Sequence, residues 1–200
     1  MLPLQTNNDL VNKYLPEIFE NEASGIIQDI MATPALIAGF MMAEEEEIHR
    51  VKEYVRNIFV EMYRGRNITV NVICDGDTLV GYSLIFIHND KNIAAYCHKI
   101  FVYKPYRNKG LGSALVKQVL NQTNGLGLIC QHNLVPFYEK LGMKYAQDFF
   151  LPENTNFDIL GSIYNGLAVV TYKVVNLSST PVFILNDEDA KEIIKLLVNK

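Results

Sequence analysis

Cysteine is scarce in this sequence of 200 residues, with Cys74, Cys97 and Cys130 as its only three. Their number is odd, no two of them form a C-x-x-C pair, and each lies in an apolar run. These features argue against a disulfide framework and against a zinc site, so we expect buried, reduced thiols. Metalloenzyme motifs such as H-E-x-x-H are also lacking, and the sequence therefore predicts no metal site.

Positive charge is scarce as well. The 18 Lys and Arg residues are outnumbered by 22 Asp and Glu residues, which gives a formal net charge of −4. A nucleic-acid-binding domain typically carries a basic surface, so we predict no nucleic-acid partner.

Long hydrophobic runs are missing too. No apolar run approaches the roughly 18 residues that a membrane-spanning helix needs. The sequence begins without the basic segment and the long apolar segment of a signal peptide. We therefore expect no membrane partner and a cytoplasmic location.

Hydrophobic residues make up 49% of the chain and charged residues 20%, which is typical of a globular protein with its own core. We predict a helical N-terminal extension at residues 1–43 and a core domain at 44–175. A C-terminal extension with an amphipathic helix is expected at 176–200.

The first 43 residues contain two segments with helical patterns, 9–19 and 24–31. We expect Pro16 and Pro34 to interrupt them, because proline removes a backbone donor and clashes with the preceding turn. The apolar run 35–42 is too short for its periodicity to distinguish a strand from a buried helix.

The rest of the chain alternates between strand and helix patterns. Glu44–Tyr63 is amphipathic, with apolar residues three and four positions apart. Asp75-Gly76 marks a hairpin between two segments rich in β-branched residues. The expected strands are 68–74, 78–87, 93–103, 126–130, 145–151 and 167–175, and the further helices are 113–120, 135–141 and 188–198.

One strand–helix–strand unit stands out among these segments. It consists of 93–103, 113–120 and 126–130. The last strand is wholly apolar, as is typical of a buried parallel strand. The sequence therefore predicts a right-handed β-α-β crossover.

The loop Arg107–Gly112 (Arg-Asn-Lys-Gly-Leu-Gly) connects the first strand of this unit to its helix. Glycines and free N–H groups at a helix N-terminus can cradle a phosphate, and Arg107 and Lys109 add positive charge. The loop lacks the Gly-Lys-Ser/Thr ending of a Walker A loop and the third glycine of a dinucleotide fingerprint. A phosphate-binding loop and a glycine-rich turn without a ligand both stay open at this point.

The segment Val102–Leu115 resembles the acetyl-CoA-binding motif [QR]-x-x-G-x-[GA] of the GCN5-related N-acetyltransferase (GNAT) superfamily. A second segment, Val135–Met143, resembles the later F-Y-x-x-x-G-F motif of that superfamily, with Met143 in place of the last phenylalanine. The two motifs occur in the family's order with one strand between them. The resemblance covers roughly residues 44–175, and the family's usual first strand is not visible.

This resemblance implies an α/β fold with a GNAT-type mixed β-sheet flanked by helices and extra helical segments at both ends of the chain. The sheet would splay open between the strands 93–102 and 126–130, and acetyl-CoA would bind in that gap. The implied contacts with acetyl-CoA are Ile100, Phe101, Val102, Arg107, Asn108, Lys109, Gly110, Leu111, Gly112, Ser113 and Asn133.

The resemblance also implies catalytic roles for three side chains. Tyr138 matches the position of a tyrosine acid near the CoA sulfur, although an aromatic residue there can also simply pack a helix. His98 is the candidate base, and Tyr96 lies two positions earlier on the same strand face. Similar positions in the arylalkylamine N-acetyltransferases carry two histidines that relay protons. A structural histidine is the competing interpretation of His98.

The implied function is transfer of an acetyl group from acetyl-CoA to a primary amine by direct attack in a ternary complex. The acceptor would be a small-molecule amine or a peptide amine, and a homodimer is a family-level expectation. A non-catalytic acyl-CoA sensor is one alternative, which would need the loop but neither His98 nor Tyr138. A protein acetyltransferase acting on lysine or on N-termini is another.

Overall fold

The computed structural model describes residues 4–5, 8–90, 92–152, 156–174 and 182–198. The chain forms two compact units, each drawn from several parts of the sequence. The sheet unit comprises Met1–Pro16, Tyr63–Asp148 and Gly166–Phe183, and the helical unit comprises Glu17–Met62, Phe149–Asn165 and Ile184–Lys200. The division of the chain into an extension, a core and a second extension stays a prediction.

The sheet unit contains one mixed sheet, with seven strands among the described residues, in the order β1-β2-β3-β4-β5-β7-β6. Neighbouring strands are antiparallel except β4 and β5, which are parallel. This arrangement confirms the predicted α/β fold. The strands are β1 (Leu4–Gln5), β2 (Ile68–Asp75), β3 (Thr78–Phe86), β4 (Ala95–Val102), β5 (Leu126–Gln131), β6 (Lys144–Asp148) and β7 (Leu167–Tyr172).

Two short features at the first edge of the sheet follow from local sequence. The Asp75-Gly76 signal does form the β2–β3 hairpin, where Gly76 has a φ of 57°. Strand β1 pairs with β2 through Leu4 and Gln5. The sequence did not reveal β1, because two residues cannot show a periodicity.

Strands β4 and β5 pair over three residues only, from Ala95 opposite Leu126 to Cys97 opposite Leu128. Beyond that point β4 continues to Val102 without a partner in the β5 register. The register between β3 and β4 also shifts next to His98, and such a bulge bends a strand and increases its twist. The sheet therefore splays where the sequence predicted it.

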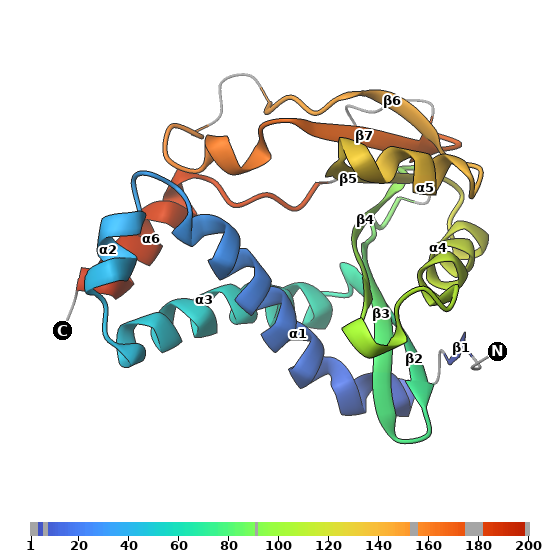
Figure 1. Cartoon of the computed structure of the whole chain (residues 1–200), viewed down its shortest axis with the longest axis horizontal. Helices are drawn as coiled ribbons and strands as arrows, with labels where there is room; N and C mark the ends of the chain where they lie inside the picture. Colours follow the sequence, from blue (N-terminus) through green and yellow to red (C-terminus); the bar gives the residue numbers. More distant parts are fainter. Residues whose placement is uncertain (1–3, 6–7, 91, 153–155, 175–181, 199–200) are drawn as a thin grey trace. The chain divides into compact units, whose positions relative to one another are not determined.

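The crossover from β4 to β5 runs through the 3₁₀ helix η1 (Lys104–Tyr106) and α4 (Leu111–Gln122). In Figure 1, α4 lies beside β3 and β4, with the short helix α5 (Val135–Glu139) near β5. Helix α4 buries an apolar stripe against the sheet, as its spacing of three and four predicts. The buried residues of this stripe are Leu111, Leu115, Val116 and Val119.

The helical unit contains α2 (Ile37–Met42), η3 (Gly161–Tyr164), α6 (Asp187–Val198), and most of α1 (Asn8–Met31) and α3 (Glu45–Arg64). The predicted break at Pro16 is wrong, because α1 runs through this residue. Proline in a helix costs about 3 kcal/mol, and burial of residues such as Ile18 and Ile30 along α1 offsets that cost. The ambiguous run 35–42 forms a helix rather than a strand.

Helices α3 and α6 agree with their sequence patterns. Helix α3 has three glutamates in its first turn, where carboxylates meet the positive end of the helix dipole. Helix α6 begins with a reciprocal cap: Asn186 Oδ1 accepts from the Glu188 N–H at 2.8 Å, and Asp189 Oδ2 accepts from the Asn186 N–H at 2.9 Å. Both predicted helices are thus confirmed.

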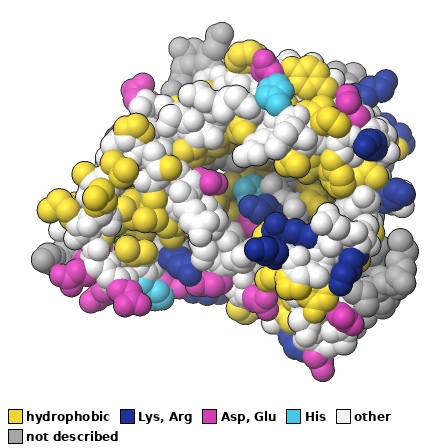
Figure 2. Space-filling view, viewed as in Figure 1, with side chains coloured by type: hydrophobic (Ala, Val, Ile, Leu, Met, Phe, Trp, Pro, Cys, Tyr) yellow, Lys and Arg dark blue, Asp and Glu magenta, His cyan; other side chains and the backbone are white. Residues whose placement is uncertain are grey.

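Hydrophobic side chains gather on the surface over α2 and α6, at the left of Figure 2. Met41 and Met42 at the end of α2 are more than four-fifths exposed. Exposed Ile194 and Val198 come from α6, which packs against α2 through Leu197 and Gly39. Within the described residues, no helix combines the length and the apolar character needed to cross a membrane.

We predict that Gly81→Ala lowers the free energy of unfolding by about 1–3 kcal/mol. Gly81 on β3 pairs with Val102, and an added Cβ would lie 2.8 Å from the Phe101 carbonyl oxygen. A backbone atom cannot move aside without displacing the end of β4. Urea unfolding monitored by circular dichroism measures the effect.

Gly112→Ala is the matched control, because its Cβ would meet the nearest atom, Phe137 Cζ, at an ordinary 3.8 Å. We expect that variant to change the free energy of unfolding by less than about 1 kcal/mol. Equal stabilities of the two variants would contradict the prediction.

Candidate active site

The end of β4 forms one wall of the candidate site. Ile100 and Val102 pack toward α4, against the cluster that contains Leu111 and Leu115. The Phe101 ring lies on the opposite face, stacked on Tyr82 with the ring centroids 5.2 Å apart. Because side chains alternate along a strand, β4 presents Ile100 and Val102 to the α4 side of the sheet.

The loop after β4 has the backbone conformation that its glycines predict. Asn108 and Gly110 both have positive φ values, 62° and 79°. A Cβ added to Gly110 would have no atom within 4 Å, so lack of space does not require a glycine here. The positive φ of this residue does, because other residues rarely adopt it. The first hydrogen bond at the start of α4 runs from the Ala114 N–H to the Gly110 carbonyl at 3.0 Å. The amides of 111–113 precede that bond and form the first turn, where helices bind anions.

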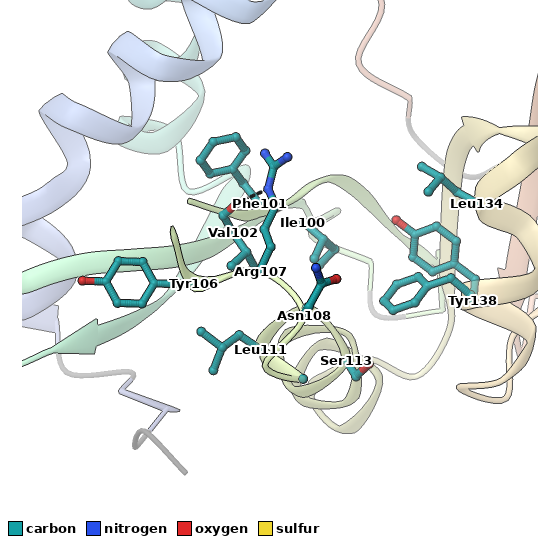
Figure 3. Close-up of a pocket in the computed structure, with 13 residues that line it drawn as sticks. Ile100, Phe101, Val102, Tyr106, Arg107, Asn108, Leu111, Ser113, Leu134 and Tyr138 are labelled. Carbon is teal, nitrogen blue, oxygen red and sulfur yellow. Dashed lines mark hydrogen bonds between the residues drawn. The ribbon is translucent and has the colours of Figure 1, made fainter. Parts of the chain in front are cut away.

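The two basic residues of the loop have different surroundings. Arg107 folds back on β4, and its Nε donates to the Val102 carbonyl at 2.9 Å (Figure 3). Lys109 places its Nζ over the Tyr106 ring, 5.2 Å from the ring centroid. Arg107 borders the pocket described below, and Lys109 lies outside its lining.

The opposite wall comes from the 3₁₀ helix η2 (His132–Leu134) and from α5. Figure 3 shows the Tyr138 hydroxyl pointing from α5 toward the β4 side of the pocket. The Tyr138 side chain is buried, and the ring of Phe137 packs edge-on against it at 5.0 Å. Phe137 also lies close to the backbone of Gly112, so α5 and the start of α4 approach each other across the site.

These walls enclose a pocket of about 490 Å³ within the sheet unit. It brings together most of the residues that the sequence predicted for acetyl-CoA contact, and Tyr138. The lining residues are Ile100, Phe101, Val102, Tyr106, Arg107, Asn108, Gly110, Leu111, Gly112, Ser113, Leu134, Phe137 and Tyr138.

Three of the lining residues were not singled out from the sequence: Tyr106, Leu134 and Phe137. Phe137 is the first aromatic of the Phe-Tyr pair in the second motif, so the motif itself was a signal for it. Tyr106 directly precedes Arg107 inside the first motif. Leu134 had no sequence signal, because a single apolar residue before a short helix is ordinary.

Four predicted residues lie outside this lining: Lys109, Asn133, His98 and Tyr96. Asn133 is exposed on η2. The ring of His98 packs edge-on against Phe86 and Phe183, with centroid distances of 5.8 and 5.1 Å.

Tyr96 belongs to the same aromatic cluster as His98. Its ring lies 6.1 Å from that of Phe86 and 6.2 Å from the imidazole. Tyr96 alternates with Cys97, which belongs to the core cluster beneath α4. Tyr96 and His98 therefore face away from the α4 side of the sheet.

Burial keeps the groups around Tyr138 protonated. Burial raises the pKa of the Tyr138 phenol above its ordinary value, and the nearby thiols Cys97 and Cys130 add to the shift. Burial also raises the pKa of Cys97 to about 12 and that of Cys130 to about 11. Near neutral pH, Tyr138 is thus a hydrogen-bond donor in an uncharged wall.

The description "Acetyltransferase (GNAT) family" belongs to a family model that matches residues 33–143, more than half of the chain. The matched region includes the loop Arg107–Gly112, the end of β4 and Tyr138. The chain therefore belongs to the acetyltransferase (GNAT) family. No protein with a curated description matches it.

Solved structures of low sequence identity resemble the chain as well. The PaiA N-acetyltransferase of Thermoplasma acidophilum, solved in complex with coenzyme A, is 16% identical over 78% of this chain and 94% of its own, with a TM-score of 0.46. A Bacillus subtilis acetyltransferase in complex with CoA is 17% identical over 60% of this chain and 84% of its own, with a TM-score of 0.43. A GNAT family acetyltransferase from Elizabethkingia anophelis with acetyl-CoA bound is 14% identical over 58% and 82%, also with a TM-score of 0.43.

The residues that the structure describes contain no group of three or more His, Cys, Asp or Glu side chains placed to hold a metal ion. The polar side chains that line the pocket are Tyr106, Arg107, Asn108, Ser113 and Tyr138.

We predict that Cys97 and Cys130 resist the thiol reagent DTNB in the folded protein at pH 8. With pKa values of about 12 and 11, roughly one Cys97 thiol in 10⁴ and one Cys130 thiol in 10³ is ionised at that pH. In guanidinium chloride all three cysteines of the chain should react. Rapid labelling of Cys97 or Cys130 without denaturant would refute the prediction.

The same shifts make stability depend on alkaline pH. A thiol whose pKa is raised by folding ionises more readily in the unfolded chain, so its contribution to stability is complete below pH 9 and is lost as the pH rises toward the folded values. The free energy of unfolding should accordingly decrease from about pH 9 to about pH 11.

Proposed function

We propose that this protein binds acetyl-CoA in the pocket between β4, α4 and α5 and transfers the acetyl group to a primary amine. One observation carries the proposal. The pocket joins the amide-bearing first turn of α4 to the part of β4 that continues past its last pair with β5. A pyrophosphate suits the first feature, and an extended chain with amide groups suits the second.

The residues present fit each part of such a ligand. The amides of 111–113 and the guanidinium of Arg107 would hold the pyrophosphate. The main chain of Ile100–Val102 would pair with the pantetheine amides.

Acetyl-CoA supplies a thioester carbonyl that an amine can attack directly. A C–N bond forms and the C–S bond breaks, so the amine must lose a proton and the departing sulfur carries negative charge. We assign Tyr138 to the sulfur, because its hydroxyl points into the pocket and burial keeps it protonated. A phenol in this state donates a hydrogen bond to a thiolate.

We propose that His98, with Tyr96 beside it, accepts the proton that the amine loses. Histidine is the side chain that most often acts as a general base. His98 sits at the bulge of β4, beside the point where β4 and β5 part, and its ring lies on the face opposite α4. The amine would then approach the thioester from that face.

A non-catalytic acyl-CoA sensor is the second candidate function. It is favoured by one observation: His98 and Tyr96 do not border the pocket that holds Tyr138. A sensor would bind acetyl-CoA as tightly as an enzyme but would show no turnover with any amine.

Our test of cofactor binding compares two glycines of positive φ. We predict that acetyl-CoA binds the wild-type protein with a micromolar Kd and that Gly110→Val weakens binding at least about tenfold, measured by calorimetry. A β-branched residue cannot hold the φ of 79° that places the start of α4.

Gly76→Val is the matched control, since it strains the β2–β3 hairpin at a φ of 57° away from the pocket. We expect this variant to bind acetyl-CoA like the wild type. Failure of the wild-type protein to bind would sink the proposed function, and Arg107–Gly112 would then be an ordinary strand-to-helix turn.

We predict that Tyr138→Phe lowers kcat roughly 100-fold while the Kd of acetyl-CoA stays within about threefold. The change removes the donor to the sulfur and keeps the ring that packs on Phe137. Release of the CoA thiol with a panel of diamines, arylalkylamines and peptide amines measures turnover. Tyr145→Phe, on the exposed edge strand β6, should leave kcat unchanged. A full kcat in Tyr138→Phe would remove Tyr138 from the mechanism.

A further inference from the structure

A polar network, buried at its sheet end and exposed at Gln122, joins the sheet to α4. Asn71 on β2 donates through Nδ2 to Ser83 Oγ at 3.0 Å and to Gln122 Oε1 at 3.1 Å. It accepts through Oδ1 from Gln118 Nε2 at 3.2 Å. Asn71 and Ser83 are both almost fully buried. An amide that combines two donor bonds with one acceptor bond is used close to its full capacity.

This network stands in an interface that is otherwise apolar. On the same side of the sheet, Ile73 and Val80 pack against Leu111 and Leu115 of α4. Leucine at the half-buried position 118 would extend that apolar stripe. A polar group buried there needs partners, and Gln118 Oε1 accepts no hydrogen bond from the residues that the structure describes. Stability alone therefore does not explain the network.

The placement of α4 on the sheet explains the network better. Aliphatic contacts are not directional, so they define the rotation and height of a helix less sharply than hydrogen bonds do. The two hydrogen bonds that join Asn71 to Gln118 and Gln122 favour one rotation and one height of the helix. Gln118 and Gln122 lie four residues apart, so both face Asn71 from successive turns. A polar residue in an apolar helix interface sets register in the same way in coiled coils.

The first turn of α4 depends on that position. The amides of 111–113 belong to the same helix as Gln118 and Gln122, roughly two turns from the first and three from the second. A helix is stiff over this length, so a rotation or a shift at Gln118 moves those amides by a similar amount.

We propose that Asn71 is a positioning residue for CoA binding, which acts through Gln118 and Gln122 to hold the first turn of α4 at the pocket. The inference rests on the proposed function, because it concerns the same pocket. Ser83 holds the Asn71 amide in place from β3.

The test separates stability from affinity with three variants. Asn71→Leu leaves Gln118 and Gln122 without their partner. The triple variant Asn71→Leu, Gln118→Leu, Gln122→Leu replaces all three amide side chains with apolar ones. Val72→Ala is the matched control, because Val72 is the next residue on β2, is fully buried, and faces the other side of the sheet.

We expect Asn71→Leu to weaken acetyl-CoA binding at least about tenfold, measured by calorimetry well below its Tm. The triple variant should regain part of the Tm that Asn71→Leu loses without regaining the affinity, since apolar partners restore packing but not position. Val72→Ala should lower the Tm and leave the affinity within about twofold.

Wild-type affinity in the triple variant would overturn the inference, and this holds even if Asn71→Leu alone does not fold. Failure of the wild-type protein to bind acetyl-CoA would refute the proposed function instead. In that case the amide NMR signals of 111–113 decide the inference without a ligand. They should shift in the triple variant and stay in place in Val72→Ala, and unchanged signals in the triple variant would overturn the positioning role.

Discussion

The end of the parallel pairing between β4 and β5, at Cys97 and Leu128, is the constraint on which the candidate site depends. Past this pair the main chain of β4 faces a gap rather than a strand. The crossover helix of a β-α-β unit must begin at the carboxyl end of its first strand, so the amides of α4 lie at the same gap. Both the gap beside β4 and the free amides at the start of α4 therefore follow from the β4–α4–β5 crossover.

The same constraint separates the groups that we assign to the reaction. Tyr138 borders the pocket on the α4 side, whereas His98 lies with Phe86 and Phe183 on the other face. Two groups on opposite faces of a continuous sheet could not serve one reaction. The sheet is not continuous at this point, because the pairing of β4 with β5 ends at Cys97, the residue before His98. Under the proposed function, the acyl donor and the amine therefore enter from different sides.

Local chemistry decided what the sequence could predict. The loop around Gly110, the hairpin at Gly76 and the cap of α6 were predictable, because each depends on a few adjacent residues. Helix α1 was not, since its long-range packing overrides the local effect of Pro16. The surroundings of Lys109 could not be predicted either, because the Lys109 Nζ lies over the Tyr106 ring rather than in the pocket. No sequence pattern linked Asn71 to Gln118, since the contact joins a strand to a helix far along the chain.

The burial of Tyr138 limits the kind of acid that this residue can be. Ordinary phenols have a pKa near 10 and ordinary thiols near 8.5, so full proton transfer to a thiolate is unfavourable by about 2 kcal/mol. Burial raises the pKa of Tyr138 further and makes the transfer still less favourable. A hydrogen bond to a thiolate does not meet this obstacle, and low polarity strengthens it. Under the proposed function, Tyr138 therefore suits stabilisation of the departing sulfur, with water supplying the proton after the product has left.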